Sequence, residues 1–181
     1  MNQPDGNRAD MNRVERLAAI EAIKALKAGY FRCMDTKDWV GFAEQFTPDA
    51  VMDINIDLGG SVGDAAGIIR GNQAIADSVR GFVGDVLTVH HGHMPEIEVM
   101  SATTARGIWA MEDMLRWPEG AAMREMHGYG HYRETYEKVD GRWRIASTQL
   151  SRLRVDIDPG EPEIPRTARE VPQSVQEIPG Q

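Results

Sequence analysis

The chain has 181 residues, of which 41% are hydrophobic and 27% are charged, and its formal net charge is -8. These values are typical of a single globular domain, and the acidic balance disfavours nucleic acid as a partner because an acidic surface repels phosphates. Because the mean hydropathy is -0.43 and the sequence has no long apolar run, we expect no transmembrane helix.

Residues 1–12 are polar and contain Pro4 and Gly6, a composition that predicts a flexible N-terminal arm. The same stretch lacks the apolar segment of a signal peptide, so we expect a cytoplasmic protein. From Arg13 onward, apolar side chains recur every three or four residues, which predicts an amphipathic helix that ends near Asp35. Its apolar stripe comprises Leu17, Ile20, Ile23, Leu26 or Lys27, Tyr30, Phe31 and Met34. Within this helix lies the one cysteine, Cys33, which we interpret as a small core residue because no metal-binding spacing surrounds it.

A second short helix is predicted from Trp39 to Phe46, where Thr47-Pro48-Asp49 would end it. Residues 50–58 then alternate between apolar and polar side chains, the pattern of a half-buried strand. Its expected buried face is Ala50, Met52, Ile54, Ile56 and Leu58. The Gly-rich stretch 59–67 predicts a mobile loop and lacks the lysine and the spacing of a phosphate-binding P-loop.

A third helix is predicted to start at Asn72 as its N-cap, with an apolar stripe of Ile75, Val79, Phe82 and Val83. Four strands should follow, over residues 87–100, 103–117, 121–139 and 142–156. Asp140-Gly141 between the last two is a strong hairpin signal. Helices followed by a strand meander indicate an α+β domain with an antiparallel sheet. We place the domain at 13–157 and predict an extended Pro-rich tail over 158–181.

The order of these elements resembles the SnoaL-like branch of the nuclear-transport-factor-2-like (NTF2-like) superfamily. The segments that carry the resemblance are IKALKAGYFRCMDTKDWVGFAEQFTPDAVMDI, IIRGNQAI, TVHHGHMPEIEV, TARGIWAMEDML and GHYRETYEKVDGRWRIASTQLSRLRV, within about residues 13–156. The resemblance implies a cone-shaped α+β barrel, with three helices packed on a curved sheet around an apolar pocket. The superfamily contains cofactor-free dehydratases, isomerases, cyclases and formaldehyde-releasing lyases, and also non-catalytic members, so the site must decide the function.

The resemblance also implies a set of catalytic residues, namely Tyr30, Asp35, His90 and Asp113. His90 resembles the catalytic histidine of the dehydratases, and Asp35 resembles the aspartate that holds such a ring in one tautomer. Tyr30 resembles a tyrosine that hydrogen-bonds a substrate oxygen, and Asp113 matches a further polar pocket residue. Acid–base catalysis without a cofactor requires a group of this kind that titrates near neutrality, with a partner that orients it.

Each of these residues also has a structural interpretation. Tyr30 fits a helix core stripe, Asp35 fits a cap of the next helix, and His90 fits a structural histidine. Asp113 shares a strand face with Trp109 and Met111, so it lies either in an apolar pocket or where the strand reaches solvent.

Five further residues are candidates for substrate binding: His91, Trp109, Met111, His131 and Arg152. Trp109 and Met111 would line the pocket for a ring system. His131 belongs to a polar stripe at the pocket mouth or on the outer surface, and Arg152 would pair with Asp113, bind a phenolate or form a surface salt bridge. His91 should point opposite to His90 in a regular strand, unless a bulge at Gly92 alters the register.

The sequence disfavours two rival chemistries, a metal site and a serine hydrolase. His91, His93 and Glu96 are similar to part of the metal site of the cupins, but the spacing is one residue short and the second motif is absent, so we expect no metal and no cofactor. A serine hydrolase is disfavoured because the chain has no GxSxG motif.

The sequence therefore favours a cofactor-independent lyase, a dehydratase or a carbon–carbon-cleaving enzyme, acting on an aromatic or polycyclic hydroxylated small molecule. An isomerase or polyketide-type cyclase with the same residues is one alternative, and a non-catalytic ligand-binding or assembly module is another. We expect a homo-oligomer, with a trimer ahead of a dimer, because an outer sheet face rich in Trp and Met should be covered by another subunit.

Overall fold

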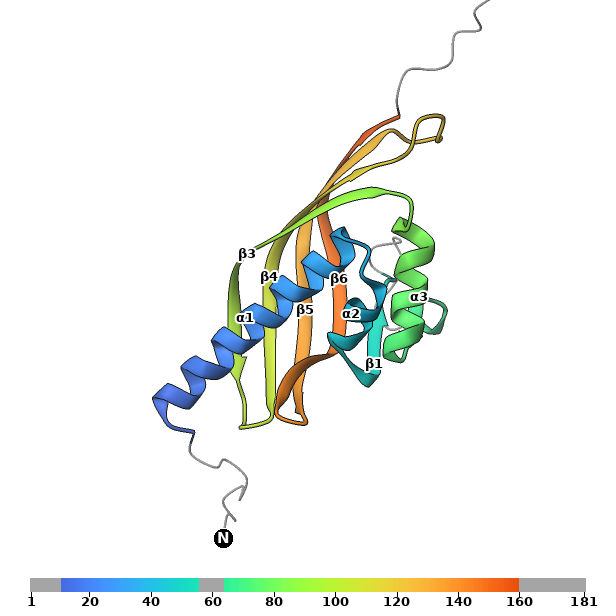
Figure 1. Ribbon diagram of the computed structural model, residues 1–181. Coiled ribbons are helices and arrows are strands. Elements are labelled where there is room, and N and C mark those ends of the chain that lie inside the picture. Colours follow the sequence, from blue (N-terminus) through green and yellow to red (C-terminus); the bar gives the residue numbers. More distant parts are fainter. Residues whose placement is uncertain (1–10, 56–63, 160–181) are drawn as a thin grey trace, which may run out of the picture.

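The computed structural model describes residues 11–55 and 64–159 (Figure 1). Its elements are α1 (Arg13–Asp35), α2 (Trp39–Glu44), β1 (Phe46–Asp53), the 3-10 turn η1 (Ala65–Gly67), β2 (Ile68–Arg70), α3 (Asn72–Val83), β3 (Leu87–Val99), β4 (Thr104–Arg116), β5 (Glu125–Val139) and β6 (Arg142–Asp158). The predictions for residues 1–10, 56–63 and 160–181 lie outside the described residues. Within the described ranges, no helix is long and apolar enough to cross a membrane.

Helix α1 has the predicted bounds, and local chemistry fixes both ends. The Asn12 side chain accepts a hydrogen bond from the backbone of Glu15, and the Glu15 carboxylate accepts one from the Asn12 backbone, which is a capping box. At the other end the backbone N–H of Asp38 donates to Cys33 and that of Lys37 to Met34, the Schellman pattern. Lys37 takes the left-handed position with φ 61°, where glycine is usual. This turn leaves Asp35 as the last residue of the helix.

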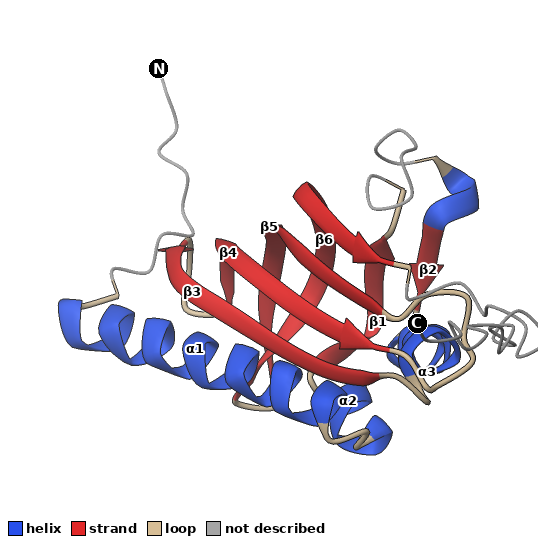
Figure 2. Cartoon of the chain, turned by 90° about the horizontal axis from the view of Figure 1, so that it is seen from above, coloured by secondary structure: helices blue, strands red, loops and turns tan. Residues whose placement is uncertain are grey.

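The six strands form one sheet in the order β2-β1-β6-β5-β4-β3. All neighbouring pairs are antiparallel except β1 and β6, which run parallel. The sheet is therefore mixed, whereas the sequence predicted an antiparallel sheet. The sheet curves, and the helices cover one of its faces (Figure 2). Asp140 and Gly141 form the predicted hairpin turn between β5 and β6, with φ values of 51° and 79° that fit a type I′ turn.

Three local predictions need correction. Phe46 begins β1 and does not end α2, because its ring packs in the core equally well from a strand. Asp53 and Asn55 are buried rather than solvent-facing, since Asp53 accepts hydrogen bonds from the Asn55 side chain and backbone and from Gln149. Helix α3 has Gly71 as its N-cap, with φ 92° and no side-chain cap, so Asn72 is its first residue.

The core lies between the helices and the concave face of the sheet. Cys33 is buried there, as predicted, whereas Leu17 on the first turns of α1 is 53% exposed. Trp109 and Trp143 also point inward and are buried, so the outer face of the sheet is less rich in tryptophan than the prediction of a covered face assumed. The exposed apolar side chains of the later strands are Leu87, Val89, Met94, Met114, Leu153, Val155 and Ile157.

Candidate active site

A pocket of about 350 Å³ lies between α1, α3 and the inner face of the sheet. Its apolar lining includes Met34, Met52, Val79, Phe82, Leu115 and Leu150. Its polar lining includes Tyr30, His90, Asp113, Tyr132, Thr148 and Arg152. A mostly apolar cavity with a few convergent polar groups is the usual form of a small-molecule site. Three larger hollows, of about 840, 740 and 410 Å³, lie elsewhere on the described chain. The first two are lined by no histidine, and the third contains His127 of the outer sheet face.

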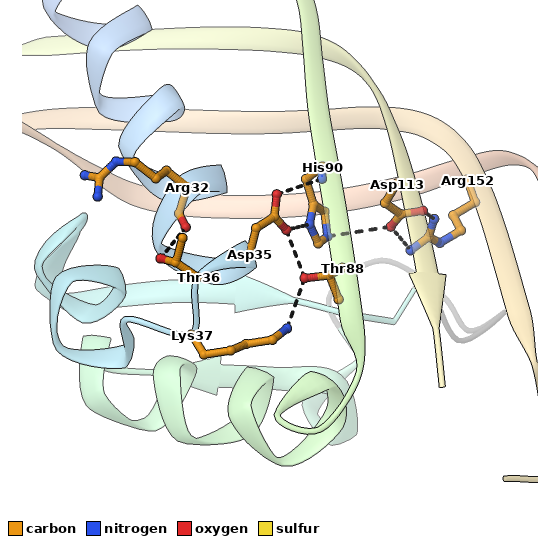
Figure 3. Close-up of polar contacts among 8 residues, drawn as sticks. All are labelled: Arg32, Asp35, Thr36, Lys37, Thr88, His90, Asp113 and Arg152. Carbon is orange, nitrogen blue, oxygen red and sulfur yellow. Dashed lines mark hydrogen bonds and ion pairs between the residues drawn. The ribbon is translucent and has the colours of Figure 1, made fainter. Parts of the chain in front are cut away.

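His90 is held by Asp35 at two points (Figure 3). The ring Nδ1 of His90 lies 2.6 Å from Oδ1 of Asp35, and the backbone N–H of His90 donates to Oδ2 at 2.9 Å. Thr88, which shares the inner face of β3 with His90, donates its hydroxyl to Asp35 Oδ1 at 2.9 Å and accepts from Lys37 Nζ. Because Nδ1 faces a carboxylate, we assign the ring proton to Nδ1, which leaves Nε2 on the pocket side.

The charge of Asp35 is stabilised by these contacts. Partial burial alone would raise the pKa of Asp35, but the hydrogen bonds from the ring and backbone of His90 and from Thr88 outweigh it and lower the pKa. Asp35 also occupies the C-terminal end of α1, where the helix dipole disfavours a negative charge. Three donors from β3 therefore stabilise the Asp35 carboxylate in a position where it orients the His90 ring.

Asp113 and Arg152 form a bidentate ion pair beyond His90 (Figure 3). Nη1 and Nη2 of Arg152 each lie 2.8 Å from one oxygen of Asp113, which is 2% exposed. Asp113 is the cross-strand partner of His90, and its Oδ2 lies 4.0 Å from His90 Nε2. Gly128, between β4 and β6, leaves room for the arginine, since a Cβ there would overlap Arg152 and Asp113. The imidazole thus lies between two carboxylates.

Tyr30 also lines the pocket, and the structure adds Tyr132 beside it. Their rings meet at 5.9 Å and 75°, and a hydrogen bond links the two side chains. Sequence reasoning missed Tyr132, although the alternation in β5 contained the signal. Gly128, Gly130 and Tyr132 occupy alternate positions, opposite in phase to the polar stripe that includes His131.

Four of the predicted substrate-binding residues lie away from the pocket lining. His91 faces outward, with its side chain 51% exposed and its Nδ1 3.3 Å from Glu112. His131 also lies on the outer face, where strand alternation opposite Tyr132 places it. Trp109 and Met111 point inward but are buried core residues, and the Trp109 indole donates to Tyr136 at 2.7 Å. Of the predicted residues, the structure brings Tyr30, Asp35, His90, Asp113 and Arg152 together.

His91 and His93, which are similar to part of a cupin metal site, lie near Glu112 on the outer face, and His127 joins them there. Glu112 contacts His127 at 3.2 Å, His91 at 3.3 Å and His93 at 3.9 Å, and the hydrogen bond with His127 is the main cause that lowers the pKa of Glu112. Across residues 11–55 and 64–159, no group of three or more His, Cys, Asp or Glu side chains is arranged to hold a metal ion.

Three solved structures have a similar fold. A hexachlorocyclohexane dehydrochlorinase, LinA type 3 from Novosphingobium barchaimii, is 20% identical with a TM-score of 0.68, over 85% of this chain and 99% of that chain. A provisionally named scytalone dehydratase from Novosphingobium aromaticivorans is 20% identical with a TM-score of 0.69, over 80% and 91%. A protein of unknown function from Mycobacterium tuberculosis is 27% identical with a TM-score of 0.61, over 76% and 78%.

The family assignment rests on the sequence itself. A family model described as a SnoaL-like domain matches residues 15–149, which is well over half of the chain. The helices, the curved sheet and the pocket described above all lie within or next to this range. The chain therefore belongs to the SnoaL-like domain family of the NTF2-like superfamily.

Proposed function

We propose that this protein is a cofactor-independent lyase that eliminates water or formaldehyde from an aromatic or polycyclic hydroxylated small molecule. The observation that carries the proposal is the Asp35–His90 contact of 2.6 Å, which places Nε2 of the ring beside a mostly apolar pocket. A histidine oriented by a carboxylate is a suitable general base at neutral pH. Several proteins of this fold are named as a dehydrochlorinase or a dehydratase, which are elimination enzymes.

In the proposed dehydration, Nε2 of His90 takes a proton from a carbon next to the hydroxyl-bearing carbon. The electron pair of that C–H bond forms the new double bond, the C–O bond breaks, and the departing hydroxide takes a proton to leave as water. The proton comes from the imidazolium just formed or from the Tyr30 hydroxyl, which lines the same pocket. For release of formaldehyde, His90 takes the O–H proton of a hydroxymethyl group, and the electron pair of that O–H bond forms the C=O bond of formaldehyde. The C–C bond breaks, its electron pair forms the new double bond, and hydroxide departs from the neighbouring carbon and takes the proton from the imidazolium to leave as water.

Asp113 is suited to an electrostatic role and not to protonating the departing oxygen. A carboxylate that accepts two hydrogen bonds from Arg152 is an acceptor and a poor donor to a departing oxygen. Lying 4.0 Å from Nε2, it instead favours the imidazolium that forms when His90 takes a proton. The positive charge would thus develop between Asp35 and Asp113, in a buried site where electrostatic interactions are strong.

An isomerase or cyclase remains the second enzymatic candidate, because proton abstraction by His90 also begins those reactions. A non-catalytic module is less well supported, since the pocket is not filled by side chains and holds an oriented histidine.

The test is a panel of aryl-substituted diols and steroid-like alcohols, incubated with purified protein in the presence of a chelator and analysed by mass spectrometry. A product lighter by one water, or by one formaldehyde and one water, supports a lyase, and an isomerised product of unchanged mass supports the second candidate. Binding of panel members without any conversion would favour the module and contradict the proposal.

A further inference from the structure

A buried lysine contacts the rings of the two pocket tyrosines. Lys27 has no exposed surface, and its Nζ lies 3.8 Å from the ring centroid of Tyr30 and 3.6 Å from that of Tyr132. Both rings belong to the pocket lining, whereas Lys27 does not. The ammonium therefore lies against both rings without being part of the pocket lining.

The position of this ammonium is fixed by the carboxylate of Glu134, which also accepts hydrogen bonds from two hydroxyl groups. Glu134 Oε1 lies 2.6 Å from Lys27 Nζ and also accepts from the Thr148 hydroxyl at 3.0 Å. Glu134 Oε2 accepts from the Tyr136 hydroxyl at 2.6 Å. Burial lowers the pKa of Lys27, and the attraction of Glu134 together with their hydrogen bond opposes that shift. Further hydrogen bonds to Glu134 and ring contacts to Lys27 compensate for the burial of this ion pair, so both charges stay in fixed positions.

A cation on the face of a phenol ring attracts its electrons, so the O–H group becomes a stronger hydrogen-bond donor. The effect is large here because the group is desolvated. Burial also raises the pKa of Tyr132 well above its ordinary value, with the charges of Tyr30 and Asp113 adding to the shift. Tyr132 therefore stays protonated. Tyr132 can therefore donate a hydrogen bond, and the contact of Lys27 with its ring is the feature that favours a strong one.

We propose that Lys27, held by Glu134, is a positioning residue that makes Tyr30 and Tyr132 a subsite for a substrate oxygen with developing negative charge. The matching ligand class is a phenolate or an enolate. This inference rests on the proposed function and narrows its substrate class, because the oxygen must be conjugated to the carbon that loses its proton. The hydroxyl pair would stabilise the oxyanion while His90 takes the proton.

The experiment uses 4-nitrophenol, whose ionised form is visible by absorbance, as a probe of the full-length protein. Ionisation of the bound probe is titrated in the wild type and in the Lys27→Met/Glu134→Gln double variant. The double change avoids leaving a buried carboxylate without its partner. Glutamine can accept from one of the Thr148 and Tyr136 hydroxyls with its oxygen and donate its NH2 to the other. Wild type should favour the bound phenolate, and the double variant should lose about tenfold in phenolate affinity.

A charge-matched control removes the same residue types from the surface, in the Glu137→Gln/Lys138→Met variant, and should leave the affinity unchanged. In a Tyr30→Phe/Tyr132→Phe background the Lys27/Glu134 change should have little further effect, because its influence passes through those two hydroxyls. An undiminished effect in that background, equal phenolate affinity in wild type and double variant, or no binding of the phenolate to the wild type would each overturn the inference. His90→Ala should keep the phenolate affinity, so loss of turnover alone would count against the proposed reaction and not against this subsite.

Discussion

The ring Nδ1 of His90 lies 2.6 Å from Oδ1 of Asp35, although 55 residues separate the two in the chain. Asp35 also accepts the backbone N–H of His90, so one carboxylate fixes both the strand and the ring that it carries. The Schellman turn after α1 and the inward face of β3 create this contact together. It determines which ring nitrogen is available to the pocket, and the first two predictions follow from it.

Asp35→Asn should reduce turnover by about a hundredfold, close to the effect of removing the histidine ring. An amide cannot stabilise the imidazolium and can favour the wrong tautomer. Because the two residues act as a unit, the Asp35→Asn/His90→Ala variant should be little slower than the slower single variant. Rates are measured under single-turnover conditions with a substrate from the panel. Additive losses would show that the residues act independently.

Acid should weaken the contribution of Asp35 to stability. Its folded-state pKa lies below the ordinary value of 3.8, so protonation costs more free energy in the folded protein than in the unfolded chain. The contribution is therefore complete above about pH 4 and is lost as the pH falls through the folded-state pKa. In urea unfolding, the difference in free energy of unfolding between wild type and Asp35→Asn should narrow below that pH. A difference that is constant with pH would contradict this assignment.

Much of the fold was predictable because its signals are local. The spacing of apolar residues predicted α1 to Asp35, and Asp140-Gly141 predicted the last hairpin turn. The end of α2 was wrong because Phe46 satisfies both helical spacing and a buried strand position. The parallel pairing of β1 with β6 is a long-range contact that has no mark in local periodicity.

The candidate site was predictable where strand alternation or the family resemblance identified a residue, as for His90 and Asp113. The same alternation predicts that His91 faces the outer side of the sheet, and only a bulge at Gly92 could turn His91 toward the pocket. The register shift does occur between Gly92 and Pro95, and it leaves His91 opposite Glu112. The helix stripe offered Leu26 or Lys27 at one position, but local spacing could not show that Lys27 pairs with Glu134, 107 residues away.

Breaking the Asp113–Arg152 pair should destabilise the protein. Arg152→Met leaves a buried carboxylate without its partner and should lower the free energy of unfolding by about 3 kcal/mol or more. The matched Asp113→Leu/Arg152→Met variant replaces both charges with apolar groups and should recover most of that loss. Urea unfolding of the three proteins measures the differences. A double variant as unstable as the single one would show that the charges themselves are required.

Gly128→Ala should disturb the same ion pair by sterics alone. The added Cβ would overlap the Arg152 guanidinium and the Asp113 carboxylate, so we expect a loss of about 1–3 kcal/mol in stability and slower turnover. Gly81→Ala is the control, because a Cβ there meets nothing within 4 Å and alanine favours a helix. The control should be neutral or slightly stabilised by thermal unfolding. Equal behaviour of the two variants would argue against a tightly packed ion pair at Gly128.

The central claim, that His90 is the acid–base group of the pocket, is tested most directly by comparing His90→Ala with His91→Ala. The two histidines are neighbours on β3 but face opposite sides of the sheet, so His91→Ala controls for effects on the strand. Single-turnover rates are measured for both folded variants with a substrate that the wild type converts. The account predicts a loss of about a hundredfold or more in His90→Ala and a rate near wild type in His91→Ala. A wild-type rate in His90→Ala would contradict it.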